Sequence, residues 1–193
     1  MEKEMDFTRL DPYMEQIQSE TLREAVRQVW EGLFQKSRWE KLEDVPCSLE
    51  PTAISLVQHT CNVTDYAIHA AKVYDQGYEE LTIHMDYLIA GCLLHDVSRI
   101  VEYEPAMGKT RVSDEGQIYV EQFLGVSAAL GANLPTEVVH MVVANTPKTN
   151  LAPATPEALI LYFCERIDMD VRNKLAGLPL RAKDKNYLIT HKD

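Results

Sequence analysis

The chain of 193 residues lacks the features that mark several large classes of protein. Its four cysteines are widely spaced and form no Cys-x-x-Cys motif, so we expect reduced, mostly buried thiols. No apolar run approaches the length needed to cross a bilayer. The first residues, Met1 to Asp6, are too acidic and polar for a signal peptide. These absences predict a soluble, cytoplasmic protein that does not associate with membranes.

Positive charge is also scarce. Nineteen lysines and arginines stand against 30 aspartates and glutamates, which gives a formal net charge of −11. Such an excess of acid argues against bulk attraction to nucleic acid or to an anionic membrane surface. A local basic pocket is compatible with this charge. A protein that binds phosphate backbones in general is not.

Internal repeats, low-complexity tracts and interdomain linkers are absent as well. The chain is 46 % hydrophobic, which is enough at this length to bury one core. We therefore expect a single domain over residues 1–193, with its core at about 11–175 and a polar, peripheral tail at 177–193.

Helical periodicity dominates what is present. We predict a compact all-α bundle of about six to eight helices, and the loop at 104–111 has the composition of a short β-hairpin. Capping residues and apolar stripes place the main helices near 11–35, 51–77, 83–101, 114–131, 135–143 and 155–175.

The pair His95-Asp96 closes the most apolar run of the chain, residues 88–94. A second histidine, His59, lies on the inward face of the preceding predicted helix, one turn after Leu56. An imidazole and a carboxylate are costly to bury without a partner, and a divalent cation satisfies both. Taken singly, each histidine could equally be a core residue with an ordinary hydrogen bond.

The last predicted helix adds two carboxylates, Glu165 and Asp168, on a stripe otherwise suited to burial. Together with His59, His95 and Asp96 they form a set of nitrogen and oxygen donors expected for Mn, Fe, Co, Ni or Zn. A metal with open coordination positions would hold a phosphate oxygen and activate water near neutral pH.

The order of these residues resembles the HD-domain superfamily of metal-dependent phosphohydrolases. The match is best with the HD domain of bacterial 3′–5′ exoribonucleases. Residues 56–60, Leu-Val-Gln-His-Thr, resemble its Leu-Leu-Glu-His-Thr, and residues 113–117 and 155–161 resemble its loop-to-helix segment and its lead-in to the final ligand helix. The similarity covers most of residues 11–172 and implies an HD-type all-α fold.

The resemblance implies that His59, His95 and Asp96 are metal ligands. The fourth ligand of the family is usually an aspartate in an Ala-Asp-x-Leu pattern, and the register places residues 164–167 there. Glu165 is therefore the expected fourth ligand, and Asp168, one turn later, is the alternative.

Other positions depart from the family. Members that bind two metals have a histidine where this chain has Glu121 and a His-His pair where it has Asn145-Thr146. We therefore expect one divalent metal ion, and we carry over neither di-iron oxygenase chemistry nor the exoribonuclease activity.

The catalytic acid and base are less well defined. Arg99 stands where some single-metal HD nucleotidases have a glutamate that orients water, and its guanidinium fork could instead hold a phosphate. Asp96, His140 or Glu121 could then transfer protons. Glu102 and Glu104 are expected to face solvent.

These features predict a phosphohydrolase for a small phosphorylated metabolite, with a nucleotide as the first choice. One alternative is a degenerate HD domain that binds a metal or a nucleotide without turnover. Another is a purely structural helical domain. A homo-oligomer is compatible with the sequence, which identifies neither the substrate nor the metal.

Overall fold

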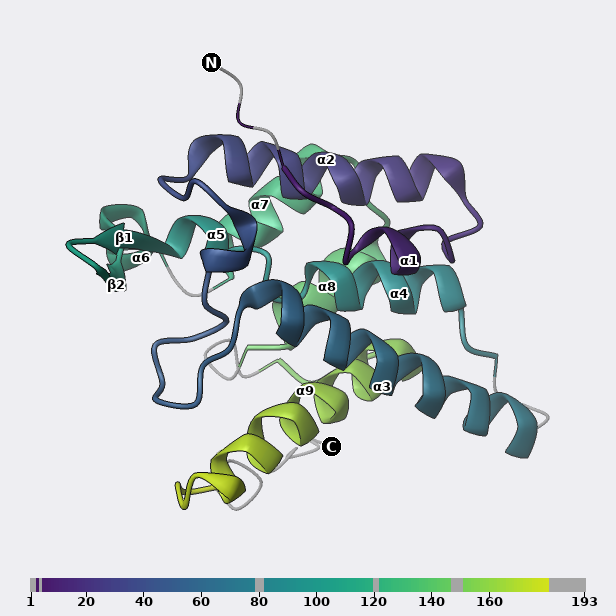
Figure 1. Ribbon diagram of the computed structural model, residues 1–193. Coiled ribbons are helices and arrows are strands. Elements are labelled where there is room, and N and C mark those ends of the chain that lie inside the picture. The colour runs from purple at the N-terminus through teal and green to yellow at the C-terminus, as the bar shows by residue number, and fades with distance from the viewer. Residues whose placement is uncertain (1–2, 4, 79–81, 120–121, 147–150, 181–193) are drawn as a thin grey trace.

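The computed structural model describes residue 3 and residues 5–78, 82–119, 122–146 and 151–180. Most of these residues are helical, so the all-α prediction is confirmed (Figure 1). The helices are α1 (Asp11–Met14), α2 (Glu20–Lys36), α3 (Leu56–Gly77), α4 (Met85–Leu94), α5 (Arg99–Glu102), α6 (Asp114–Ile118), α7 (Phe123–Gly131), α8 (Thr136–Ala144) and α9 (Pro156–Leu175), with a 3₁₀ turn η1 at Leu42–Asp44. Most of the expected tail, residues 181–193, lies outside the described residues.

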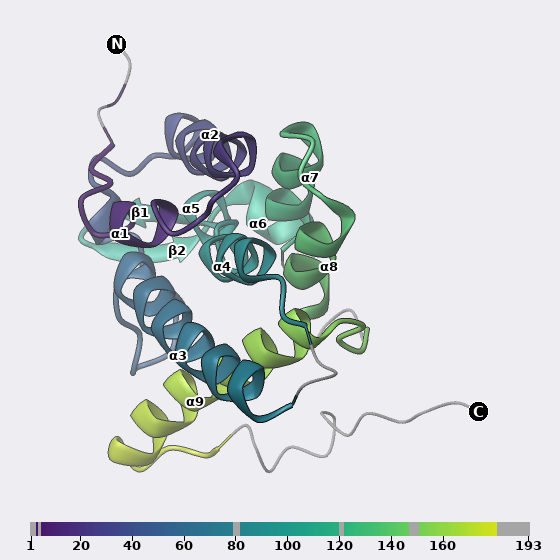
Figure 2. The ribbon, with the colours of Figure 1, turned by 90° about the vertical axis from the view of Figure 1, so that its right-hand side faces the viewer.

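Helix α4 is the central helix of the bundle. It contacts α1, α2, α3, α8 and α9, and Figure 2 shows these helices arranged around it. Every residue from Leu88 to Leu94 is buried. A helix that is apolar on all sides is stable only when other elements surround it, and the sequence of α4 meets that condition. The His95-Asp96 pair therefore follows directly on the most deeply buried element.

The predicted hairpin is present. Strands β1 (Tyr103–Ala106) and β2 (Lys109–Val112) pair antiparallel, with Tyr103 opposite Val112. Met107 and Gly108 connect them with positive φ angles of 48° and 75°. All four cysteines are buried and free, as expected.

The predicted helix at 11–35 is wrong in one respect, because the structure breaks it between Met14 and Glu20. The Asp86 carboxylate of α4 accepts hydrogen bonds from the backbone N–H groups of Gln18 and Ser19, both at 2.9 Å. The Ser19 hydroxyl then accepts from Leu22 N at 3.3 Å and caps α2. The break depends on a contact with a distant helix, which the periodicity of the segment does not reveal.

The predicted helix start at Pro51 is also wrong, since α3 begins at Leu56. Cys47 N donates to Ile54 O at 2.9 Å, and Leu56 N donates to Val45 O at 2.7 Å. These bonds close residues 46–55 into a loop, and the Ser55 hydroxyl caps α3 by accepting from Gln58 N. The predicted end at Gly77 is correct.

Two further predicted helices are interrupted. The segment 83–101 leaves the α-helix after Leu94, where tighter bonds follow, Val97 N to Leu94 O at 3.1 Å and Arg99 N to Asp96 O at 3.0 Å. The segment 114–131 breaks near Gln122, whose φ of 69° is left-handed. Both interruptions carry polar residues of the candidate site. The last two predicted helices match α8 and α9 closely.

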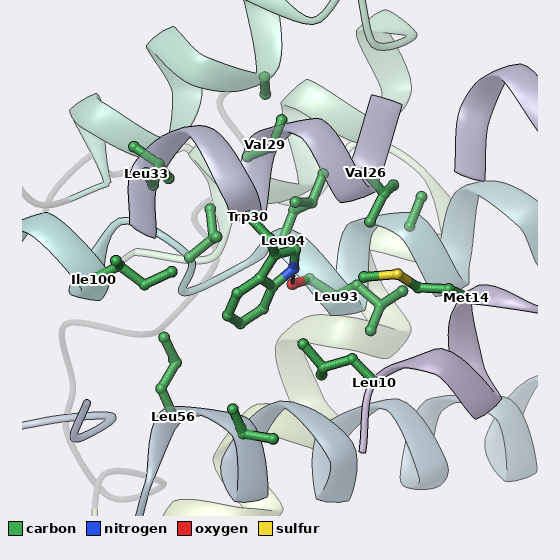
Figure 3. Packing of buried hydrophobic residues seen from close by; sticks show 14 of the residues in the cluster. Leu10, Met14, Val26, Val29, Trp30, Leu33, Leu56, Leu93, Leu94 and Ile100 are labelled. Atoms are coloured by element: carbon green, nitrogen blue, oxygen red, sulfur yellow. Dashed lines mark hydrogen bonds between the residues drawn. The ribbon is translucent and has the colours of Figure 1, made fainter. Parts of the chain in front are cut away.

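The core fixes the carboxyl end of α4. Trp30 of α2 is fully buried among Leu10, Met14 and other apolar side chains (Figure 3). Its indole N–H donates to the carbonyl oxygen of Leu93 at 3.1 Å. The last carbonyl groups of a helix lack partners within the helix, so this bond satisfies one of them. It also anchors the backbone two residues before His95.

Helices α4 and α8 lie side by side and run in the same direction. His84 and Tyr87 at the start of α4 and Leu134 and Pro135 before α8 line one surface cavity of about 800 Å³. Farther along, Gly91 of α4 faces Met141 of α8 so closely that a β-carbon on Gly91 would lie 2.3 Å from Met141 Cε. The missing side chain of Gly91 allows this close approach.

We expect Gly91→Ala to lower the free energy of unfolding by about 1–3 kcal/mol, because Met141 is buried and must move to admit the methyl group. Urea denaturation followed by circular dichroism measures this. Gly32→Ala is the control, since Gly32 lies in α2 with no atom within 4 Å of the added β-carbon. That change should stabilise the protein by about 1 kcal/mol. If Gly91→Ala stabilised the protein similarly, the close packing of α4 on α8 would be refuted.

Candidate metal centre

Three side chains converge inside the bundle. His59 comes from α3, and His95 and Asp96 come from the turn after α4. His59 Nε2 lies 3.2 Å from His95 Nε2 and 3.7 Å from Asp96 Oδ2, and His95 Nε2 lies 3.9 Å from Asp96 Oδ2. At most 5 % of each residue is exposed. In the described part of the chain, only these three residues form a group of His, Cys, Asp or Glu side chains that could hold a metal ion.

The second nitrogen of His59 is held by α9. His59 Nδ1 lies 2.7 Å from Asp168 Oδ2, and Asp168 also accepts from Asn62 Nδ2 at 3.0 Å and from Arg172 Nη2 at 2.9 Å. Burial alone would raise the pKa of the Asp168 carboxyl, but these partners, His59 first, lower that pKa to about 2. An ionised carboxylate can only accept, so Nδ1 of His59 carries the proton. In neutral His59, Nε2 then presents a lone pair to the site.

His95 is oriented in the same way by its own helix. Its Nδ1 lies 2.7 Å from the carbonyl oxygen of Cys92, which can only accept a hydrogen bond. The proton of the neutral ring therefore resides on Nδ1, and Nε2 carries a lone pair. Burial lowers the pKa of His95 to about 4, so the ring is neutral at pH 7.

Asp96 supplies the third donor. Its Oδ1 accepts from Gln122 Nε2 at 2.5 Å, and Arg99 Nη2 lies 3.6 Å from the same oxygen. Burial would raise the pKa of Asp96, but the Arg99 guanidinium, followed by His95 and His59, lowers that pKa to about 2. Oδ2 faces the two imidazoles as an anionic oxygen. When His59 is neutral, three electron-pair donors face one another, an arrangement that a cation stabilises.

Gln122 is a site residue that the sequence did not reveal. Its main-chain N–H donates to Glu102 Oε1 at 2.8 Å, and its side-chain oxygen accepts from Ser98 Oγ at 2.8 Å. The left-handed backbone at this residue is uncommon for a side chain other than glycine. A glutamine in a loop has no distinguishing pattern, so only the structure shows that it holds Asp96.

Arg99, which the sequence suggested as a phosphate-binding residue, lies beside Asp96. Its Nη1 donates to Glu102 Oε2 at 2.7 Å, and only 11 % of its side chain is exposed. The expectation that Glu102 and Glu104 face solvent is wrong, because both are buried. Glu102 is bound by Arg99 and Gln122, and Glu104 pairs with Arg38 at 3.2 Å and with Arg111. Charged partners make this burial tolerable: Arg99, three residues earlier, for Glu102, and Arg38 and Arg111 for Glu104.

The remaining candidates occupy different places. Glu165 is buried on α9, one turn before Asp168, and its carboxylate lies 3.5 Å from Arg166 Nη1. Within the described residues, neither Glu165 nor Asp168 joins the group formed by His59, His95 and Asp96 within 4.8 Å. Asp168 reaches that group through His59 Nδ1, so the identity of a fourth ligand stays a prediction.

His140 lies on α8 and is half-buried. Its Nε2 accepts from Ala154 N at 2.9 Å, which ties α8 to the segment before α9. Burial lowers its pKa. Glu121, the other candidate for proton transfer, lies outside the described residues.

Two imidazoles and one carboxylate, each fixed by a neighbour, define the kind of site that binds a divalent metal with open positions.

Comparison with known proteins finds similarity to an enzyme that cleaves a phosphate ester. The chain is similar to dihydroneopterin 2′,3′-cyclic phosphate phosphodiesterase of Methanocaldococcus jannaschii, with 26 % identity over 202 residues, covering 96 % of this chain and 77 % of the relative. No family model and no solved structure matches the chain. The similarity suggests a phosphohydrolase family.

Among the described residues, no helix is both long enough and hydrophobic enough to cross a bilayer.

Proposed function

We propose that the protein is a hydrolase that uses one divalent metal ion, bound by His59, His95 and Asp96, to cleave a phosphoester of a small metabolite. The observation that carries this proposal is the convergence of two imidazole nitrogens and one carboxylate oxygen, separated by 3.2 to 3.9 Å. Ligands about 2.1 Å from one ion in tetrahedral or octahedral geometry lie roughly 3.0–3.5 Å apart. Small movements would therefore close the triangle around a metal.

The donor set fits Mn, Fe, Co, Ni or Zn, since imidazole and carboxylate suit all of these ions. When bound, such an ion polarises a phosphoryl oxygen and lowers the pKa of a coordinated water. Glu165 is the proposed fourth ligand and Asp168 the alternative. Asp168 also supports the site from behind, because its carboxylate fixes the ring and the tautomer of His59.

Neighbouring residues hold the proposed ligands in position and place a positive charge beside them. The Cys92 carbonyl holds His95, and Gln122 holds Asp96, so that each ligand is fixed before the metal binds. Arg99 places a guanidinium beside Asp96, where we propose that it neutralises charge on the substrate phosphate. His140 is the proposed proton-transfer residue from α8, and Asp96 the alternative.

A phosphodiester is the first proposed substrate class. The HD-domain resemblance supports phosphate-ester hydrolysis, and the relative is named for cleavage of a cyclic phosphate of dihydroneopterin. We propose 2′,3′-cyclic phosphates of pterins or nucleosides, followed by nucleotide monoesters. In the reaction a water oxygen bonds to phosphorus, one P–O ester bond breaks, and the departing oxygen keeps the electron pair and takes up a proton. The cyclic diester becomes a monoester with a free hydroxyl group.

A domain that binds a metal without turnover is the second candidate. Arg99 favours it, because its guanidinium already pairs with Glu102 and Asp96. A phosphate would have to compete with these carboxylates for the same donors.

Metal-dependent hydrolysis tests the proposal. The purified protein is stripped with a chelator, reloaded with each of the five metals and incubated with 2′,3′-cyclic nucleotides, a pterin cyclic phosphate and nucleoside monophosphates. We expect product release only from reloaded protein, with ring opening of a cyclic phosphate as the fastest reaction. Stoichiometric metal without hydrolysis of any substrate would support the binding domain. A failure to retain any metal would reject both functions.

A further inference from the structure

Asn145, which follows the last residue of α8, carries a buried acceptor that the fold leaves unused. Only 4 % of the residue is exposed. Within the part of the chain that the structure describes, its Oδ1 accepts no hydrogen bond. Buried polar side-chain atoms nearly always have a partner, so an unused one suggests a ligand.

The packing of α8 against α4 places Asn145 at the same end of the bundle as the candidate metal centre. Both helices begin beside one cavity, and farther along Met141 of α8 contacts Gly91 of α4. His95 follows Gly91 by four residues, and Asn145 follows Met141 by four. Residues four apart lie on one face of a helix, so His95 and Asn145 are each one turn beyond the contact. Figures 1 and 2 show α8 beside α4 from both directions.

The chemistry of this end determines what Asn145 can bind. His59 Nε2, His95 Nε2 and Asp96 Oδ2 already present lone pairs there. A carboxamide oxygen adds a further lone pair, and acceptors cannot satisfy one another. A cation satisfies all of them at once, and amide carbonyl oxygens are accepted ligands of hard divalent ions.

We propose that Asn145 Oδ1 is an oxygen ligand of the cation bound by His59, His95 and Asp96. This inference rests on the proposed function, because it requires that the site bind a metal. It makes α8 a contributor to the centre and gives the donor set a neutral oxygen. Carbonyl oxygen suits manganese better than zinc, so the loss of Asn145 should weaken manganese binding more than zinc binding.

Metal affinity tests this role without relying on activity. Metal-stripped wild type, Asn145→Leu and Asn145→Asp are titrated with Mn²⁺ and with Zn²⁺ against a competing chelator, and the visible absorption of the Co²⁺ form is recorded. We expect Asn145→Leu to bind Mn²⁺ at least about 10-fold more weakly and to change the Co²⁺ spectrum. Asn145→Asp should bind Mn²⁺ at least as tightly as wild type, because it keeps the oxygen and adds negative charge.

Asn173→Leu is the matched control. Asn173 is equally buried, but its Oδ1 already accepts from Thr52 Oγ1 at 2.8 Å. This change should lower thermal stability and leave Mn²⁺ affinity and the Co²⁺ spectrum unchanged. The comparison separates loss of a ligand from the general cost of removing a buried amide.

The metal titrations of these variants either support or overturn the role of Asn145. Wild-type Mn²⁺ affinity and Co²⁺ spectrum in a folded Asn145→Leu protein would overturn the role of Asn145 and leave the proposed function intact. If the wild type bound no metal, the proposed function would fail and this role with it. If Asn145→Leu did not fold, a loss of Mn²⁺ affinity in Asn145→Asp would overturn the inference, and an equal or tighter affinity would support it.

Discussion

Replacing His95 with glutamine is expected to lower the affinity for divalent metal by more than about 100-fold and to abolish metal-dependent hydrolysis. Loss of a residue that merely orients a metal ligand already costs about 10- to 100-fold, and His95 is proposed as a ligand itself. Its Nε2 lies 3.2 Å from that of His59, within the proposed group of ligand atoms. The glutamine amide fills much of the space but cannot place an aromatic nitrogen at the same point.

His69→Gln is the matched control for this experiment. His69 lies on α3 and is exposed, and its Nδ1 lies 2.8 Å from the Asp65 carbonyl oxygen. Isothermal titration of stripped protein with Mn²⁺ or Zn²⁺ measures the affinity, and hydrolysis is assayed on the best substrate. Tight metal binding by a folded His95→Gln protein would show that the metal centre lies elsewhere.

Metal-free protein is expected to lose about 3 kcal/mol of unfolding free energy between pH 6.5 and pH 4. Burial lowers the pKa of His95 from 6.5 to about 4, so in this window the unfolded chain takes up a proton that the folded chain does not. Stability therefore rises with pH across the window and falls as the solution is acidified. A difference of about 2.5 pKa units corresponds to roughly 3 kcal/mol.

The two site aspartates extend this trend to lower pH. The pKa values of Asp96 and Asp168 are both lowered from 3.8 to about 2, so their stabilisation is present above pH 3.8 and lost below it. Urea denaturation at a series of pH values, with chelator present, measures the whole profile. His95→Gln should flatten most of the slope between pH 6.5 and 4 and keep the decline below pH 4. A wild-type profile flat from pH 7 to 4 would contradict the buried, neutral state of His95.

The sequence was sufficient to predict the elements that depend on local order. Apolar periodicity and capping residues located α8 and α9 to within a residue, and the apolar run 88–94 lies in a predicted helix, 83–101, that contains α4. The periodicity of the segment 51–77 also placed His59 on the inward face of its helix. His95 and Asp96 follow α4, and the resemblance to HD domains supplied the prediction that they meet His59.

The supporting contacts could not be predicted, because they join residues far apart in the chain. Gln122 holds Asp96 across 26 positions, and Asp168 holds His59 across 109. The breaks before α2 and near Gln122 depend on backbone bonds to the side chains of Asp86 and Glu102. Neither periodicity nor composition of the local segment records such partners, and the burial of Glu102 was missed for the same reason.

The two tryptophans give the protein an internal optical probe of this region. The Trp30 indole donates to the Leu93 carbonyl, and the Trp39 indole donates to the Tyr103 carbonyl at 3.0 Å. These bonds bracket the stretch of chain that carries His95, Asp96 and Arg99. Since both rings are buried and the chain has no other tryptophan, its tryptophan emission originates at the two ends of that stretch. Occupation of the site can therefore be followed by native fluorescence, with no label attached.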